Sequence, residues 1–246
     1  MQTLKNKVAL VTGGSRGIGS AIVKKLAQEG ATVAFTYVNE RKKAQTLVAE
    51  LLKKGMHVMA IKADNSVAGE VTSAIEETIS KFKTLDILIN SAGIYIGKPF
   101  EEHTLEDYDK TMAINARAVV EACIIASKKM PHNGRIITIG SNMASRVPSA
   151  QGTLYAMSKS ALVGLTKGLA RDLGPKGITV NLVQPGSTNT DMNPENSDHA
   201  DFQRSLMAIP RYGKAEHIAD LVAYLANPDS MYTTGGIFTI DGGANS

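Results

Sequence analysis

Short runs of β-branched and other apolar residues alternate with longer amphipathic stretches through almost the whole chain. This rhythm requires crossover connections, which are typical of a parallel sheet. The expected strands are Val8–Val11, Thr32–Tyr37, His57–Lys62, Leu85–Asn90, Arg135–Gly140, Thr179–Gln184 and Ile237–Ile240. The expected helices are Gly17–Glu29, Arg41–Lys54, Val67–Phe82, Leu105–Lys129, Leu154–Leu173 and Ala215–Ala226. We therefore predict an α/β fold, a Rossmann-type doubly wound sheet of seven mainly parallel strands with helices on both faces.

The chain shows no internal repeat, low-complexity tract or flexible linker, so residues 1–246 are expected to form a single domain. The rhythm breaks only between Gln184 and about Arg211, in a stretch rich in proline, asparagine, aspartate and serine. A long irregular segment in a compact domain is usually functional. We therefore predict a substrate lid at residues 185–211, with a mobile surface loop as the alternative.

The composition excludes several other classes of protein. With 43% hydrophobic and 20% charged residues, the chain resembles an ordinary globular protein, and its apolar runs are too short for a membrane span. The N-terminal residues lack a secretory signal, so we expect a cytoplasmic protein. Cys123 cannot form an internal disulfide, and no metal-ligand spacing occurs. The net charge of +4 comes from interspersed residues, which modestly favours anionic ligands and is weak evidence for nucleic acid. We therefore expect a small-molecule substrate and no nucleic-acid or membrane partner.

A glycine-rich turn, Thr12-Gly13-Gly14-Ser15-Arg16-Gly17-Ile18-Gly19, joins the first expected strand to the first expected helix. Such a turn presents backbone N–H groups and the positive end of a helix dipole to a pyrophosphate, and glycine lets the backbone approach closely. Taken alone, the turn could be only a tight connection. Its place in the α/β pattern predicts a dinucleotide site, with contacts from Gly13, Ser15, Arg16, Gly17, Ile18 and Gly19.

The end of the second expected strand indicates which dinucleotide is bound. Folds that prefer NAD carry an acidic residue there, whereas this chain has Tyr37. Arg16 lies in the glycine turn, and Arg41, Lys42 and Lys43 follow close by. Cations stabilise a 2′-phosphate that a carboxylate would repel, so we predict NADP(H) as the cofactor. The alternative is that residues 41–43 form only a solvated helix start.

Tyr155 and Lys159 lie one helical turn apart, which places both side chains on one face of the expected helix. A phenol has an ordinary pKa near 10, and a neighbouring ammonium favours the phenolate and lowers that pKa. The spacing therefore predicts that Tyr155 donates a proton and that Lys159 lowers its pKa. Alone, this spacing is more often a surface pair with an extended lysine.

Ser141 follows the expected strand at residues 135–140, and ligands of parallel sheets lie beyond the carboxyl ends of strands. Its hydroxyl is placed to hydrogen-bond a reacting carbonyl oxygen, although turn chemistry is an alternative and Ser145 is a competitor. Asn115 falls on the apolar stripe of the helix expected at residues 105–129. Its amide is predicted either to bond the backbone or to hold a water on a proton path toward Lys159.

Five motifs resemble those of the short-chain dehydrogenase/reductase family, and the match runs over essentially the whole chain. They are Thr12-Gly13-x-x-x-Gly17-Ile18-Gly19, Asn90-Ser91-Ala92-Gly93, Tyr155-Ala-Met-Ser-Lys159, Pro185-Gly186 and Asp241-Gly242-Gly243. The resemblance implies that Ser141 orients the carbonyl, Tyr155 delivers the proton, Lys159 binds the nicotinamide ribose and Asn115 supports a water relay. Further cofactor contacts that it implies are Asp64, Asn65, Asn90, Ala92, Gly93, Pro185, Gly186, Ser187, Thr188 and Thr190.

The family resemblance implies NADPH-dependent reduction of a ketone or 3-oxoacyl carbonyl to an alcohol, with Tyr155 as general acid. Residues 135–141 are similar to the 3-oxoacyl-carrier-protein reductase type. Residues 158–162 and 182–186 resemble a branch described as cyclic-di-GMP-binding biofilm-dispersal mediators. A regulatory protein that binds cyclic-di-GMP or NADP with little turnover is therefore the alternative. The family also implies a homotetramer. A partly apolar substrate pocket is expected from Ile94, Tyr95, Met143, Val147, Met192 and Leu206.

Overall fold

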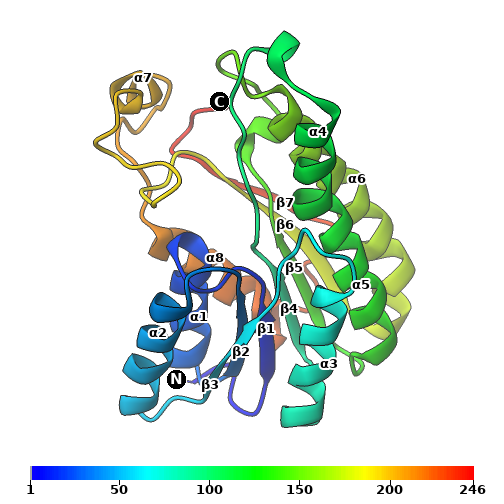
Figure 1. The fold of residues 1–246 in the computed structure, drawn as a ribbon. Helices are drawn as coiled ribbons and strands as arrows, with labels where there is room; N and C mark the ends of the chain where they lie inside the picture. Colours follow the sequence, from blue (N-terminus) through cyan, green and yellow to red (C-terminus); the bar gives the residue numbers. More distant parts are fainter. Residues whose placement is uncertain (1) are drawn as a thin grey trace.

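The computed structural model describes residues 2–246, which contain one sheet of seven parallel strands in the order β3-β2-β1-β4-β5-β6-β7 (Figure 1). The strands are β1 (Val8–Val11), β2 (Thr32–Tyr37), β3 (Val58–Lys62), β4 (Ile87–Asn90), β5 (Arg135–Ile139), β6 (Thr179–Pro185) and β7 (Ile237–Ile240). The chain winds outward from β1 in one direction and then from β4 in the other, as in a doubly wound sheet. The predicted fold is confirmed, and every strand boundary lies within two residues of its prediction.

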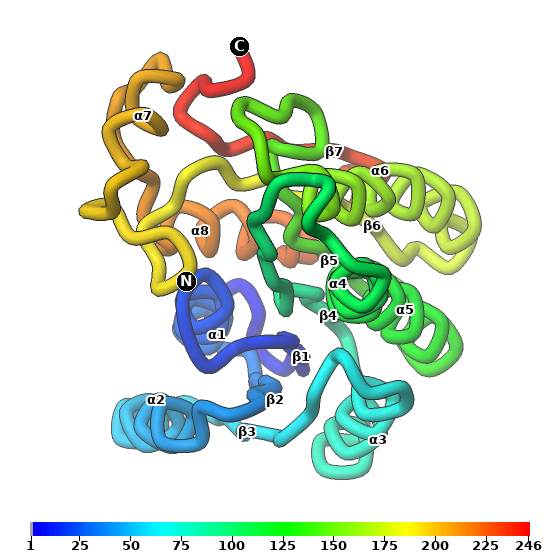
Figure 2. The backbone as a smooth tube through the Cα atoms, turned by 45° about the horizontal axis from the view of Figure 1, so that its top comes forward, coloured from blue at the N-terminus to red at the C-terminus, as the bar shows by residue number. Residues whose placement is uncertain are grey.

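Helices cover both faces of this sheet (Figure 2). They are α1 (Gly17–Gln28), α2 (Arg41–Lys53), α3 (Glu70–Phe82), α4 (Leu105–Met112), α5 (Ala118–Lys129), α6 (Thr153–Leu173), α7 (Ala200–Ser205) and α8 (Ala215–Ala226). α1, α2 and α8 share one core with Ile89, whereas α3, α5 and α6 share the other with Leu88. Successive strand residues point to opposite faces, so these neighbours enter different cores. Among the helices of residues 2–246, none is long and apolar enough to cross a membrane.

The stretch predicted as one helix, Leu105–Lys129, is interrupted. α4 ends at Met112, Ala113–Arg117 form a π-helical turn, and α5 begins at Ala118. A π-turn widens the helix and changes the direction of the side chains that follow it, and such turns are frequent at functional sites. The apolar spacing that predicted a continuous helix cannot reveal it. Asn115 lies within the turn and is fully buried, as its place on the apolar stripe predicted.

The segment predicted as an irregular lid, residues 185–211, includes the short helix α7 and lies beyond the carboxyl ends of the strands, where Figure 1 shows it in yellow and gold. Isolated bridges join Thr188 to Gly213 and Thr190 to Asn193. The Tyr212 hydroxyl donates to Oε1 of Gln203 at 2.9 Å and ties α7 to the base of the segment. The helix was missed because six residues are too few to show a helical period.

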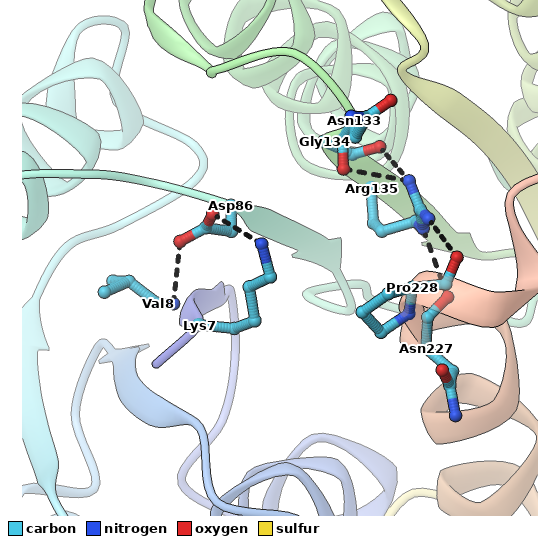
Figure 3. A network of polar contacts seen from close by, with 8 residues as sticks. All are labelled: Lys7, Val8, Asp86, Asn133, Gly134, Arg135, Asn227 and Pro228. Carbon is cyan, nitrogen blue, oxygen red and sulfur yellow. Dashed lines mark hydrogen bonds and ion pairs between the residues drawn. The ribbon is translucent and has the colours of Figure 1, made fainter. Parts of the chain in front are cut away.

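A polar network closes the opposite edge of the sheet, where the strands begin (Figure 3). Asp86 accepts hydrogen bonds from the backbone N–H of Val8 at 3.0 Å and from the Lys7 ammonium at 3.4 Å. The guanidinium of Arg135 is only 3% exposed and donates to four backbone carbonyls, those of Asn133, Gly134, Asn227 and Pro228. A cavity of about 220 Å³ borders this network. Because the polar groups around it already bond one another, we assign this edge a structural role.

Candidate functional site

The first β–α turn leaves backbone donors free. Within residues 2–246, no acceptor takes the N–H groups of Arg16, Gly17 or Ile18, which open α1. Gly13 and Gly17 have φ angles of +68° and +52°, in the left-handed region that favours glycine. A Cβ atom on Gly13 would lie 2.9 Å from Cα of Ala92. Free N–H groups, a positive helix end and a bare backbone fit a pyrophosphate.

Two threonines, whose hydrogen bonds the sequence analysis did not predict, hold this turn in place. Oγ1 of Thr36 accepts from the Gly13 N–H at 2.9 Å, and Oγ1 of Thr12 accepts from the N–H groups of Ser91 and Ala92 at 3.0 and 3.2 Å. Gly19 is buried against Gly13, and Ser15 is half-buried at the tip of the turn. The hydroxyls thus join the glycine turn to the loop after β4.

The corner expected to meet a 2′-phosphate contains both cations and carboxylates. Tyr37 is half-buried at the end of β2, and Arg16 is exposed in the glycine turn. Lys43 pairs with Asp191 of the 185–211 segment at 2.9 Å. Arg41 and Lys42 are exposed and have no ion pair with another described residue, as expected for a solvated helix start. Of the three predicted cations at residues 41–43, only Lys43 forms an ion pair with the 185–211 segment at this corner.

Three other predicted contacts are partly turned toward the protein. Oδ1 of Asp64 accepts from the N–H and hydroxyl of Ser66 at 2.8 and 2.7 Å, and Asn65 is buried beside it after β3. Nδ2 of Asn90 donates to Oγ1 of Thr138 at 3.3 Å, inside the sheet. A cofactor contact from Asn90 would therefore come from its backbone rather than its amide.

Tyr155 and Lys159 meet on one buried face of α6. Lys159 is only 4% exposed, and its ammonium donates to the Ile139 carbonyl at the end of β5 at 3.0 Å. Nζ of Lys159 lies 5.7 Å from the centroid of the Tyr155 ring. A Cβ atom on Gly93 would lie 3.3 Å from the same nitrogen, so the loop after β4 covers the pair. The alternative of a solvated surface pair is excluded.

The electrostatics of this pair differ from the prediction. Burial raises the pKa of Tyr155, and interaction with the Ser141 hydroxyl offsets only part of this rise. Burial also lowers the pKa of Lys159 to about 8. The pKa of Tyr155 is therefore raised on balance rather than lowered as predicted, because desolvation disfavours both charged forms in this structure. Spacing along a helix shows that two groups are close, but it does not show how far both are removed from water.

Ser141, rather than Ser145, lies with Tyr155. Ser141 follows β5 and caps a 3₁₀ turn, where its Oγ accepts from the Met143 N–H at 3.1 Å, and it acts on the pKa of Tyr155. The Ser145 hydroxyl donates instead to Oε1 of Gln184 at 3.5 Å. The hydroxyl of Ser141 can donate to a ligand while its oxygen accepts from the backbone.

Asn115 joins the loop after β4 to α6. Its Oδ1 accepts from the Ile94 N–H at 2.9 Å, and its Nδ2 donates to the Ile94 carbonyl and the Ser158 hydroxyl, each at 3.0 Å. Both amide hydrogens are therefore used, and one lone pair of Oδ1 remains. The predicted hydrogen bonds between the Asn115 amide and the backbone are thus present, while the water relay toward Lys159 stays a prediction.

An aromatic and apolar wall stands beside Tyr155. The Tyr95 ring meets the Tyr155 ring edge-on, with centroids 5.2 Å apart and an interplanar angle of 72°. Within 4 Å of a Cβ atom on Gly152 lie side-chain atoms of Met143, Val147 and Tyr95. These three predicted pocket residues are thus gathered in one place, whereas Met192 is exposed in the 185–211 segment and Leu206 follows α7. The edge-on Tyr95 contact had no signal in the local sequence pattern.

The segment after β6 passes over the glycine turn. A Cβ atom on Gly17 would lie 3.4 Å from the Thr190 side chain, and one on Gly186 would lie 2.5 Å from Cβ of Asp241. Pro185 ends β6, Ser187 is half-buried and Thr188 is buried. This segment and the C-terminal tail therefore pack together above the sheet. Nowhere in residues 2–246 are three His, Cys, Asp or Glu side chains grouped to hold a metal ion.

Comparison with known proteins gives consistent results. A family model described as enoyl-(acyl carrier protein) reductase matches residues 13–245. A solved short-chain dehydrogenase from Burkholderia cenocepacia J2315, in complex with NADP, is 50% identical, with a TM-score of 0.98, and the match covers 99% of this chain and 100% of that one. The cyclic-di-GMP-binding biofilm dispersal mediator protein of Escherichia coli (strain K12) is 42% identical over 98% of each chain. A hydroxynaphthalene reductase-like protein from Metarhizium robertsii is 37% identical over 99% of this chain and 96% of its own length.

Proposed function

This chain belongs to the short-chain dehydrogenase/reductase family, and from that premise we propose that it reduces a ketone or 3-oxoacyl carbonyl to an alcohol with NADPH. The family predicted from the motifs is thus confirmed. The observation that carries the proposed reaction is the meeting of Ser141, Tyr155 and Lys159 beside the free N–H groups of the glycine turn. A half-buried proton donor next to a buried lysine suits catalysis at a carbonyl.

The proposed coenzyme suits the residues of the glycine turn. The free N–H groups of Arg16, Gly17 and Ile18 would hold the pyrophosphate. Tyr37 stands where a carboxylate would repel a 2′-phosphate, and Arg16 lies at the same corner. The relative from Burkholderia cenocepacia, 50% identical, was solved with NADP, which supports the same preference here.

Three side chains would divide the proton chemistry. NADPH, when bound, supplies the hydride. The Ser141 hydroxyl donates a hydrogen bond to the carbonyl oxygen and orients it, and the Tyr155 phenol donates its proton to that oxygen as negative charge develops there. Burial raises the pKa of Tyr155, so the phenol keeps its proton until the acceptor becomes strongly basic. Charged Lys159, 5.7 Å from the ring centroid, then stabilises the phenolate.

Asn115 is proposed to act beside this group through position rather than through contact with substrate. It fixes Ile94 by two backbone hydrogen bonds and so holds the loop that covers Lys159. Its remaining Oδ1 lone pair is suited to hold a water that returns a proton toward Lys159.

The proposed substrate is partly apolar. Tyr95, Met143 and Val147 form a wall beside Tyr155, and residues 185–211 supply Met192 and Leu206 as the lid. Apolar walls with a few fixed polar groups are typical of small-molecule sites. We further propose that the protein acts in the cytoplasm as a homotetramer. The exposed apolar side chains of Val120 and Ile124 on α5 support assembly with further copies of this chain.

The proposed function is tested by NADPH consumption against a panel of ketones, with the wild type and Tyr155→Phe compared. The wild type should turn over, and the variant should lose roughly 10²–10⁴-fold in kcat because it has no proton to donate. Coenzyme affinity, measured by fluorescence titration, should stay within about twofold. An inert wild type across the panel would contradict the proposal.

A second candidate function has one specific observation in its favour, the 42% identity to a protein described as a cyclic-di-GMP-binding biofilm dispersal mediator. On this alternative, the chain binds a cyclic dinucleotide or NADP and turns over little. Calorimetric titration with cyclic-di-GMP separates the two. If the wild type and Tyr155→Phe both bind cyclic-di-GMP tightly and neither consumes NADPH with any ketone of the panel, the regulatory function is favoured.

A further inference from the structure

Three charged side chains meet where the 185–211 segment crosses the glycine turn, which itself carries Arg16. Nζ of Lys43, on the first turn of α2, lies 2.9 Å from Oδ2 of Asp191 and 4.0 Å from Oε2 of Glu40. Asp191 raises the pKa of Lys43 and Lys43 lowers that of Asp191, and the positive charge of Arg16 in the glycine turn acts on both groups to a smaller extent. The cluster therefore joins the glycine turn, the start of α2 and the proposed lid.

The chain around Asp191 directs its carboxylate toward this corner. The preceding Thr190 packs on Gly17, whose Cβ would lie 3.4 Å from the threonine methyl, and Thr190 also forms a bridge with Asn193. Figure 2 shows this yellow segment beside the blue turn that opens α1. Asp191 is thus at the tip of a short loop held against the glycine turn.

The charges of this cluster cancel. Arg16 and Lys43 contribute two positive charges, and Glu40 and Asp191 contribute two negative charges. A phosphate monoester carries roughly −1.5 to −2 charges at neutral pH, so it binds best where cations lack internal partners. A 2′-phosphate entering this corner therefore meets two carboxylates, and Asp191, which lies closer to Lys43 than Glu40 does, is the stronger competitor for that cation.

We propose that Asp191 is a specificity-determining residue, an internal carboxylate that occupies the cationic corner until the 2′-phosphate of the coenzyme displaces it. The inference rests on the proposed function. Displacement breaks the ion pair between Lys43 and Asp191 and frees the tip of the 185–211 segment. A coenzyme without the 2′-phosphate leaves the pair intact. The competing arrangement is a clasp, in which the same pair closes over either coenzyme.

The test compares dissociation constants for NADPH and NADH, measured by fluorescence titration on the full chain, for the wild type and Asp191→Asn. Because exposed ion pairs are weak, the variant should bind NADPH roughly two- to fivefold more tightly, with NADH unchanged. The gain should shrink as salt rises. Asp198→Asn is the matched control, an exposed aspartate of the same segment with no ion pair to another described residue, and it should change neither constant.

Two further measurements make the test independent of coenzyme affinity alone. Lys43→Met should bind NADPH more weakly than the wild type does. Adding Asp191→Asn to Lys43→Met should raise the NADPH affinity by a smaller factor than Asp191→Asn raises it in the wild type. Without coenzyme, Asp191→Asn should also be cut faster by protease within residues 185–211. Weaker binding of both coenzymes by Asp191→Asn would establish the clasp and overturn the proposal. NADPH binding that does not respond to Asp191→Asn would also overturn it, whereas no NADPH binding by the wild type would overturn the proposed function too.

Discussion

Two buried cations, Arg135 and Lys159, lie at opposite edges of the same sheet and differ in how many hydrogen bonds they donate to the protein. Arg135, where β5 begins, donates to four backbone carbonyls (Figure 3). Lys159, beside the end of β5, donates to one, that of Ile139. Both are at least 96% buried, with relative exposures of 3% and 4%. The fold uses four of the five N–H donors of Arg135, whereas it uses one of the three N–H donors of Lys159.

The surroundings repeat this difference. At the edge where strands begin, Asp86 is engaged by both Val8 and Lys7. At the edge where strands end, the N–H groups that open α1 have no acceptor among residues 2–246, and buried Nε2 of Gln184 has no partner there either. Unsatisfied polar groups are costly, so they persist where a ligand completes them. Thr179, where β6 begins, also has a buried hydroxyl oxygen without a partner. What distinguishes the candidate active site is therefore its free backbone N–H groups and the partly used ammonium of Lys159, rather than burial.

The largest expected effect comes from removing the incompletely bonded cation. Lys159→Met should lower kcat/KM for NADPH-dependent ketone reduction roughly 10²–10⁴-fold, because the phenolate of Tyr155 loses its neighbouring charge. Its free energy of unfolding should stay the same or rise, since an apolar isostere of a buried charge is often neutral or stabilising. Steady-state kinetics and urea denaturation measure the two effects. If Lys159→Met kept its activity but lost stability, Lys159 would have a structural role like that of Arg135.

Arg135→Met should have the opposite profile. Four backbone carbonyls, that of Gly134 fully buried, lose their donor, so we expect the free energy of unfolding to fall by about 3 kcal/mol. Once folded, the variant should bind NADPH as tightly as the wild type does, because the change lies at the other edge of the sheet. Arg135→Lys is the matched control, and it should lose less, since an ammonium still reaches some of these carbonyls. A coenzyme affinity that falls with Arg135→Met would break the separation between the two edges.

Features that depend on residues close together in the sequence could be predicted, and features that depend on contacts between distant segments of the chain could not. The glycine turn and the pairing of Tyr155 with Lys159 depend on residues within one turn or one helix, and both lie where predicted. The π-turn around Asn115 leaves no trace in apolar spacing. Contacts between Lys43 and Asp191, or between Tyr95 and Tyr155, join segments far apart in the chain. The pKa directions were missed for the same reason, because desolvation depends on every element packed around a group.

The pH dependence of stability should also separate the two cations. Burial lowers the pKa of Lys159 to about 8 from its ordinary value of 10.5, so the unfolded chain holds this proton more strongly. The free energy of unfolding should therefore rise with pH between about 7.5 and 9.5, by roughly 2 kcal/mol from this group. Urea denaturation at several pH values would show the rise in the wild type and its loss in Lys159→Met. Persistence of the whole rise in that variant would assign it to other groups.

The smallest expected effect is at the exposed end of the structural network. Lys7 is partly exposed and lies 3.4 Å from Asp86, so Lys7→Met should lower the free energy of unfolding by only about 0.5 kcal/mol. Asp86→Ala should cost about 1–2 kcal/mol, because it leaves the buried N–H of Val8 without its acceptor. Urea denaturation of both variants, with coenzyme affinity measured in parallel, tests the order. Equal losses of stability would mean that the ion pair between Lys7 and Asp86, rather than the buried hydrogen bond to Val8, stabilises this edge of the sheet. Hydrogen bonding to the backbone would then not explain the stability of the edge.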